Sequence, residues 1–211
     1  MAFQDRQHAG QQLAKALAMY QDREILLFAL PRGGAVVAAE IAKIFGISMD
    51  LIITRKIGAP LHEEYALGAL AETGEVYWNA SERSHQSDRA VLAIVEKERE
   101  EAKRRINLYR KGRSLPEMER KTVLIVDDGL ATGATMHAAV LAAKHQGAKE
   151  IVVAIPHGAA DSIEGLESQG VKVVCLMTPE PYGAVGAHYE TFDQTKDAEV
   201  LQLMEEYGPE G

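Results

Sequence analysis

The chain has 211 residues, of which 46% are hydrophobic and 26% charged, a composition typical of one globular domain with a substantial core. Its formal charge of −8 disfavours broad binding of nucleic acid, and no run of about 18 apolar residues is present for a membrane span. The first 20 residues carry charge where a signal peptide is apolar, and the single cysteine, Cys175, allows no intrachain disulfide, so we expect a cytoplasmic protein.

Short β-branched runs alternate with helical segments along most of the chain. The predicted elements of the first half are a helix at 5–20, a strand at 24–30, a helix at 35–45, a strand at 49–54, two short strands within 65–79 and a broken helical stripe at 87–110. The second half predicts strands at 122–126, 150–155 and 171–177, with helices at 133–145 and 161–169 between them.

Strands separated by helices of this length indicate an α/β fold: a mostly parallel, twisted sheet with helices on both faces. We expect one domain over residues 1–211. Because ligands of such sheets bind at the carboxyl ends of the strands, the loops that follow the strands are where a site is expected.

Two adjacent carboxylates and a loop of small residues follow the strand at 122–126. Asp127 and Asp128 can accept hydrogen bonds from a ribose diol or bind a cation such as Mg²⁺. Residues 131–135, "ATGAT", offer backbone N–H groups at the start of a helix, which suits a phosphate. A diol and a phosphate within one short span predict a ribose 5-phosphate ligand.

This stretch, "VLIVDDGLATGAT", resembles the phosphoribosyl pyrophosphate (PRPP) signature of the type I phosphoribosyltransferases. Gly129 departs from it, since the family usually has an aliphatic residue or Ser there. The resemblance implies the fold of that family, with Asp127 and Asp128 on the ribose hydroxyls. It also implies that the 5-phosphate is wrapped by Ala131, Thr132, Gly133, Ala134 and Thr135.

Two other loops match a pyrophosphate site. "LPRGGA" places Arg32 and Gly33 directly after the strand at 24–30, which resembles the pyrophosphate loop of the family. In "TRK", Arg55 and Lys56 are expected at the same sheet edge, with Lys56 favoured as the pyrophosphate lysine and a surface ion pair as the alternative. Arg32, Lys56 and Mg²⁺ would stabilise the leaving charge, so Lys56, Arg32, Asp127 and Asp128 are the predicted catalytic residues.

The resemblance implies further features without fixing them. Mg²⁺ would be held mainly through PRPP, with Asp127 or Asp128 as the protein ligand, and a homodimer is expected. A helical or flap insertion is expected at about 81–115, and a C-terminal hood at about 178–211. Glu64 matches an acid of a less characterised branch, although Glu63 blurs that match.

The acceptor is not identified by the sequence. Ala131 stands where several oxopurine enzymes of the family have an Asp, so their candidate general base is missing. Tyr182, Tyr189 and Phe192 could stack a nucleobase or simply pack on the core. The leading function is therefore transfer of the phosphoribosyl group to an unidentified nitrogenous acceptor, most simply a nucleobase.

A PRPP- or nucleotide-sensing regulator of the same fold, acting on RNA, DNA or a protein, is the alternative. The basic segment "KRRINLYRKGR", residues 103–113, favours it, although the solvated end of a helix explains that segment better. Nucleic acid and membrane are not expected as partners.

Overall fold

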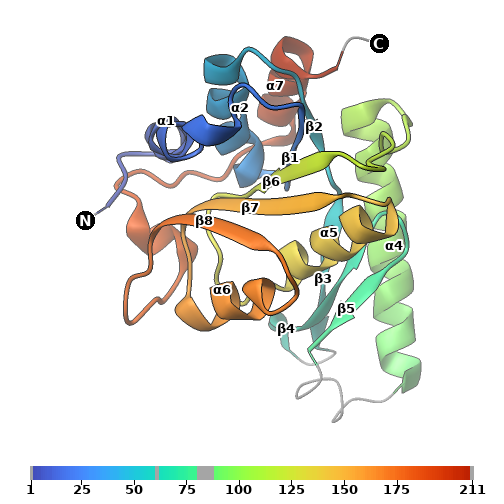
Figure 1. The fold of residues 1–211 in the computed structure, drawn as a ribbon. Coiled ribbons are helices and arrows are strands. Elements are labelled where there is room, and N and C mark those ends of the chain that lie inside the picture. The colour runs from blue at the N-terminus through green and yellow to red at the C-terminus, as the bar shows by residue number, and fades with distance from the viewer. Residues whose placement is uncertain (1, 60–61, 80–87, 210–211) are drawn as a thin grey trace.

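The computed structural model of the chain describes residues 2–59, 62–79 and 88–209, with the backbone alone for 62–64 and for residue 88. A five-stranded parallel sheet in the order β2-β1-β6-β7-β8 forms its centre (Figure 1). Its strands are β1 (Ile25–Ala29), β2 (Met49–Leu51), β6 (Thr122–Val126), β7 (Glu150–His157) and β8 (Lys172–Met177). The predicted parallel sheet is confirmed.

Helices cover both faces of this sheet, as predicted. On one face lie α1 (Arg6–Ala16), the short 3-10 helix η1 (Ala18–Tyr20), α2 (Gly33–Phe45) and α7 (Asp197–Tyr207). On the other face lie α5 (Ala134–His145) and α6 (Ala160–Glu167). A second 3-10 helix, η2 (Val185–His188), lies in the loop between β8 and α7.

Strand β6 shows why the pattern specifies a central strand. All five of its residues are buried, as expected for a parallel strand covered on both sides. Val123 and Ile125 pack in the core under α5 and α6, whereas Leu124 and Val126 pack in the core under α1 and α2. The strand therefore fixes the position of the acid pair that follows it.

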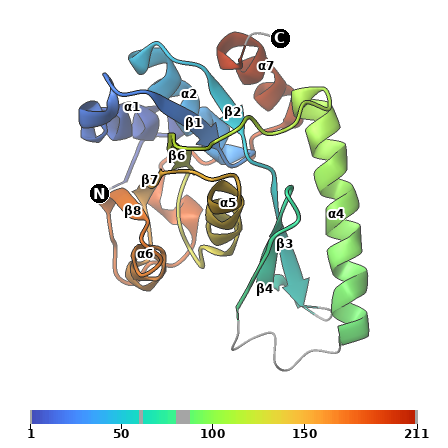
Figure 2. The ribbon, with the colours of Figure 1, turned by 45° about the vertical axis from the view of Figure 1, so that its right-hand side comes forward.

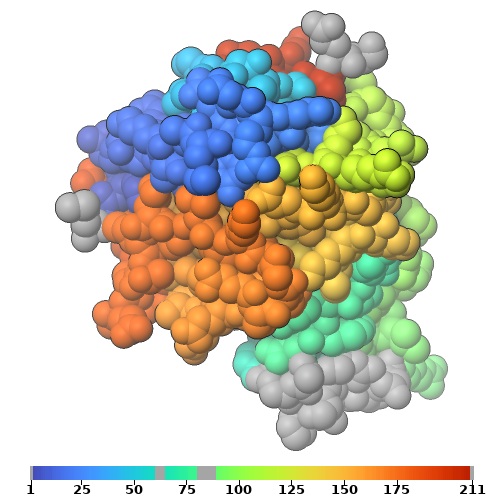
Figure 3. Space-filling view, in the orientation of Figure 1, coloured from blue at the N-terminus to red at the C-terminus, as the bar shows by residue number. Residues whose placement is uncertain are grey.

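A second, antiparallel sheet stands beside the first. Its strands are β3 (Thr54–Ala59), β4 (His62–Ala71) and β5 (Val76–Trp78), and the long helix α4 (Asp88–Arg110) packs along it (Figure 2). Gly74, with a φ of 102°, lies in the turn between β4 and β5, which confirms the predicted hairpin. In the space-filling view this unit projects below the main body (Figure 3).

The strand predicted at 49–54 is wrong in its extent. Strand β2 ends at Leu51, and Thr54 already begins β3, which pairs with β4 in the other sheet. The chain leaves the parallel sheet between these strands, although Ile52 and Ile53 are fully buried. An unbroken apolar run therefore spans the crossing from one sheet to the other, and periodicity alone cannot divide it.

The C-terminal region has two parts. Residues 178–193 pass beside the carboxyl ends of the parallel strands, and α7 then packs on α2 through buried Val200 and its neighbours. Among the described residues, no helix is both long and apolar enough to cross a membrane.

Candidate functional site

The acid pair lies at the carboxyl end of β6. Asp127 accepts the backbone N–H of Asp128 on its Oδ1 at 2.9 Å, and Asp128 accepts the Nε–H of Arg6 on its Oδ2 at 2.7 Å. Burial, reinforced by the neighbouring Asp128 carboxylate, raises the pKa of Asp127 well above its usual value. The two half-buried carboxylates are therefore held differently, one by the backbone that follows the strand and one by a cation from α1.

The loop that begins α2 packs directly on these carboxylates. A Cβ on Gly33 would lie 1.9 Å from Asp128 Oδ2, and a Cβ on Gly34 would lie 2.8 Å from the carbonyl oxygen of Val126. Neither position can hold a side chain without moving the loop or the acids. The structure thus brings the predicted pyrophosphate loop and the predicted ribose acids together, and glycine is what permits the contact.

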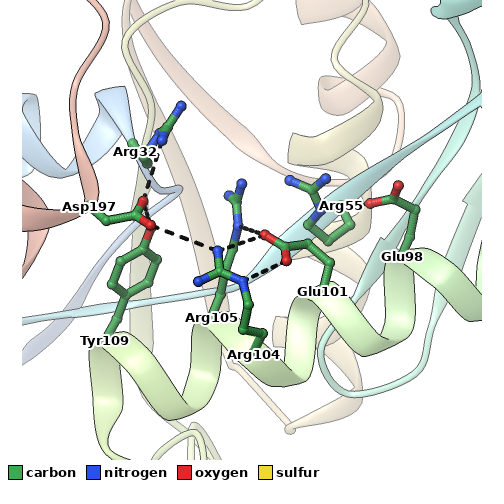
Figure 4. A network of polar contacts seen from close by, with 8 residues as sticks. All are labelled: Arg32, Arg55, Glu98, Glu101, Arg104, Arg105, Tyr109 and Asp197. Atoms are coloured by element: carbon green, nitrogen blue, oxygen red, sulfur yellow. Dashed lines mark hydrogen bonds and ion pairs between the residues drawn. The ribbon is translucent and has the colours of Figure 1, made fainter.

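Arg32 in this loop faces the C-terminal helix. Its Nη1 lies 3.3 Å from Asp197 Oδ1, and the Tyr109 hydroxyl donates to the same oxygen at 2.6 Å (Figure 4). The hydrogen bond from Tyr109 and then the charge of Arg32 lower the pKa of Asp197. The Pro31–Arg32 peptide bond is cis. One carboxylate of α7 thus holds Arg32, the arginine predicted to bind pyrophosphate.

The predicted phosphate loop, residues 131–135, leads into the first turn of α5. Gly133, with a φ of 72°, stands just before the helix, which begins at Ala134. The N–H groups of a first helical turn have no partner inside the helix, and the positive end of the helix dipole lies with them. Ser162 donates its hydroxyl to the carbonyl oxygen of Ala131 at 2.5 Å, which fastens the loop to α6.

Arg55 and Lys56 do not end a strand of the parallel sheet. Both lie inside β3 of the antiparallel sheet. The prediction that they lie at the carboxyl edge of the parallel sheet is therefore wrong, because the chain passes from one sheet to the other before Thr54. Arg55 donates to Glu98 of α4 at 2.7 Å (Figure 4). Arg55 therefore forms the ion pair that was the alternative to a role at the pyrophosphate. The side chains of Glu63 and Glu64 lie outside the described residues.

His157 is a residue that sequence reasoning missed. It ends β7, is fully buried, and contacts Tyr182, whose hydroxyl lies 2.8 Å from its Nδ1. Burial, with a smaller contribution from nearby His188, lowers the pKa of His157 to about 4, so the imidazole is neutral. Its position at the carboxyl end of a central strand was the signal that could have identified it.

The aromatic side chains of the predicted hood pack around His157. Tyr189 meets its ring edge-on at a centroid separation of 5.2 Å and donates to the Asp128 carbonyl oxygen at 2.5 Å. Phe192 stacks on Tyr189, with centroids 5.0 Å apart. In the described structure these rings pack on the molecule itself, and through Tyr189 they reach the acid pair.

Gly129 is explained by the same cluster. A Cβ there would lie 2.6 Å from His157 Cε1 and 2.7 Å from Val185 Cγ1, both closer than real Cβ contacts. The departure from the signature therefore makes room for His157.

Replacing Gly129 with alanine should lower the free energy of unfolding by about 1–3 kcal/mol, the usual cost of overpacking a filled core. Urea unfolding measures this change. Gly165→Ala is the matched control. Gly165 lies inside α6, and a Cβ on it would meet only the His137 ring, at an ordinary contact distance of 3.6 Å. A Gly129→Ala protein as stable as wild type would contradict the explanation.

The acid pair offers the carboxylate ligands that suit Mg²⁺. Among the described residues there is no group of three or more His, Cys, Asp or Glu side chains that could hold a metal. Two adjacent carboxylates fit an ion that takes most of its oxygen ligands from a bound phosphate compound.

Comparisons with known proteins agree with this geometry. A family model described as the phosphoribosyl transferase domain matches residues 3–189. The "Putative phosphoribosyl transferase Rv0571c" of Mycobacterium tuberculosis is 38% identical over 205 residues, which is 96% of this chain and 46% of that protein. The chain thus spans about half the length of the curated relatives it matches.

Solved structures give the same result for the fold. The crystal structure of TT1426 from Thermus thermophilus is 35% identical and superposes with a TM-score of 0.82, covering 99% of this chain and 100% of that one. The AQ2163 protein of Aquifex aeolicus, at 12% identity and a TM-score of 0.50, shares the fold; 82% of this chain and 74% of that chain are covered.

Proposed function

Because the chain belongs to the phosphoribosyl transferase domain family, we propose that it transfers the 5-phosphoribosyl group of Mg-PRPP to a nitrogenous acceptor, with release of pyrophosphate. The observation that carries this proposal is the direct packing of Gly33 on the Asp128 carboxylate. A loop suited to a diphosphate and acids suited to a ribose diol thus meet at one edge of the sheet, beside the amides that begin α5.

In the proposed reaction, the bond between the ribose anomeric carbon and the pyrophosphate oxygen breaks, and a bond from that carbon to an acceptor nitrogen forms. Asp127 and Asp128 bind the ribose hydroxyls and favour the positive charge that develops on the sugar. Arg32, oriented by Asp197, stabilises the negative charge that develops on the pyrophosphate. Lys56, in β3, is proposed as a second cation for that group.

Magnesium, when bound with PRPP, would neutralise the diphosphate and make it a better leaving group. We propose that the donor's own oxygens supply most of its ligands, with Asp127 or Asp128 as the protein contribution.

The acceptor is proposed to be a nucleobase that enters beside residues 178–193, next to the carboxyl end of β7. His157, neutral and buried there, and Tyr182, its partner, lie at that edge of the sheet. With Ala131 in the phosphate loop, no carboxylate is present at that position to deprotonate an oxopurine. An acceptor that needs no general base from this loop therefore fits best.

The regulatory alternative rested on the basic segment at 103–113, and the structure gives that segment another role. Five of its six cations form ion pairs with carboxylates of the chain: Lys103, Arg104, Arg105, Arg110 and Arg113. Cations already paired in this way contribute less to a nucleic-acid surface, which supports the enzyme over the RNA- or DNA-binding regulator.

Pyrophosphate release from PRPP with Mg²⁺ tests the proposal. The measurement is made with and without purines, pyrimidines, nicotinate and other amides, and we expect one class of acceptor to stimulate release at least about tenfold. Binding of PRPP without stimulation by any acceptor would favour the sensor instead.

A further inference from the structure

Arg6, the first residue of α1, is buried among three parts of the site. Its Nε donates to Asp128 Oδ2 at 2.7 Å, and its Nη1 donates to the carbonyl oxygen of Asp193 at 2.7 Å. Its guanidinium carbon lies 3.8 Å from the centroid of the Phe192 ring. Only 11% of the side chain is exposed, because it packs between Asp128 on one side and Phe192 and Asp193 on the other.

A cavity of about 250 Å³ opens beside this arginine. The described residues that line it are Arg6, Arg32, Gly33, Phe192, Gln194 and Thr195. Two of them are arginines, and none is acidic. Each arginine pairs with a carboxylate, Asp128 or Asp197, that does not line the cavity, so the lining itself offers guanidinium and other polar groups without a carboxylate among them.

Arg6 and Arg32 reach this cavity from different segments, α1 and the loop before α2. Gly33 lies between them, and a Cβ on it would fall 2.9 Å from Arg6 Nε as well as against Asp128. A group bound in the cavity would therefore meet Gly33 of the loop and a guanidinium from each segment. Two guanidiniums converging on one cavity favour a ligand with more than one phosphate oxygen to share.

We propose that Arg6 is a second phosphate-binding arginine of the donor site, and that with Arg32 it binds the diphosphate of PRPP in this cavity. This inference rests on the proposed function and adds to it a residue from outside the recognised loops. Because Arg6 also donates to Asp128, one guanidinium would bind the diphosphate and hold the carboxylate that binds the ribose. The N-terminal helix thereby takes part in binding the donor.

Calorimetric titration with Mg²⁺ and inorganic pyrophosphate tests this inference, because pyrophosphate lacks the ribose that Asp128 would bind. Arg6→Gln should weaken pyrophosphate binding at least about tenfold, the effect of losing one charge-assisted contact. Arg6→Lys keeps the charge and should recover part of the affinity. Thermal melting of each variant shows that it is folded.

Arg23→Gln is the matched control. Arg23 also pairs with a carboxylate, Glu150 at 2.6 Å, and lies 5.0 Å from the Tyr20 ring, but it stands at the other end of the sheet. Its affinity for pyrophosphate should stay within about twofold of wild type, because no contact near the cavity changes. The same result for Arg6→Gln would overturn the inference.

Failure of the proposed function is a separate outcome. A wild-type protein that binds no PRPP would contradict the function itself. A wild-type protein that binds PRPP and pyrophosphate, with Arg6→Gln binding both equally well, would contradict only the role of Arg6.

Discussion

Replacing both Asp127 and Asp128 with asparagine is expected to weaken Mg-PRPP binding at least about 100-fold while leaving the protein folded. Each carboxylate is proposed to accept a hydrogen bond from a ribose hydroxyl, and hydrogen bonds to charged groups contribute about 1.5–3 kcal/mol each. Loss of both charges therefore costs about 3 kcal/mol or more, which is a factor of about 100 or more in affinity. Calorimetric titration with Mg-PRPP measures it.

The fold should survive because asparagine keeps a carbonyl oxygen at each position, one to accept the backbone N–H of residue 128 and one to accept the Arg6 Nε–H. Thermal melting of the double variant measures the stability that is lost with the Arg6 ion pair. Burial and the adjacent Asp128 carboxylate raise the pKa of Asp127, so a neutral amide at this position is compatible with the ligand-free fold. Glu205→Gln with Glu206→Gln is the control, since these are also adjacent carboxylates but are exposed on α7. Unchanged affinity in the Asp127 and Asp128 double variant would refute the proposed role of the acid pair.

Replacing Arg110 with glutamine should lower the free energy of unfolding by about 3–5 kcal/mol, the usual effect of removing one partner of a buried ion pair. Arg110 is 1% exposed, pairs with Glu72, and donates to the carbonyl oxygen of Leu51 at 2.9 Å. Burial raises the pKa of Glu72 even though Arg110 opposes that shift. Without the arginine, a buried carboxylate would be left uncompensated.

Arg110 and Glu72 connect the two sheets. Arg110 ends α4, Leu51 ends β2 of the parallel sheet, and Glu72 follows β4 of the antiparallel sheet. Urea unfolding at unchanged m-value measures the loss. Arg104→Gln is the control, because that side chain is 52% exposed and its pairing should contribute less than about 1 kcal/mol.

A double variant, Arg110→Gln with Glu72→Gln, should be more stable than the single Arg110→Gln variant because no unpaired buried charge remains. Equal stability of Arg110→Gln and wild type would show that the pair does not join the sheets.

Much of the fold was predictable from local patterns. Strand β6 was predicted at its observed bounds, since Thr122 and four apolar residues stand between charged Lys121 and Asp127. The hairpin turn at Gly74 followed from turn chemistry. The crossing between sheets after Leu51 was not predictable, because Thr54 pairs with Ala71, far along the chain, and nothing local marks that partner.

The site divides in the same way. Asp127, Asp128 and the phosphate loop form one continuous motif, so residue types and spacing were enough to place them together. Arg6 was not predicted, because an arginine near the start of an amphipathic helix looks like any solvated charge. Its role depends on α1 packing against α2, which puts it beside Asp128, and only the tertiary structure contains that contact.

Calorimetric titration of the wild-type protein with Mg-PRPP, and separately with ribose 5-phosphate, tests the central claim most directly. Under the proposed function, the acid pair and residues 131–135 would bind the ribose 5-phosphate part of both ligands, but only PRPP carries the diphosphate proposed to meet Arg32. We therefore expect both to bind, with Mg-PRPP at least about tenfold tighter, a difference of about 1.4 kcal/mol. Absence of PRPP binding, or equal affinity for the two ligands, would contradict a donor site at this edge of the sheet.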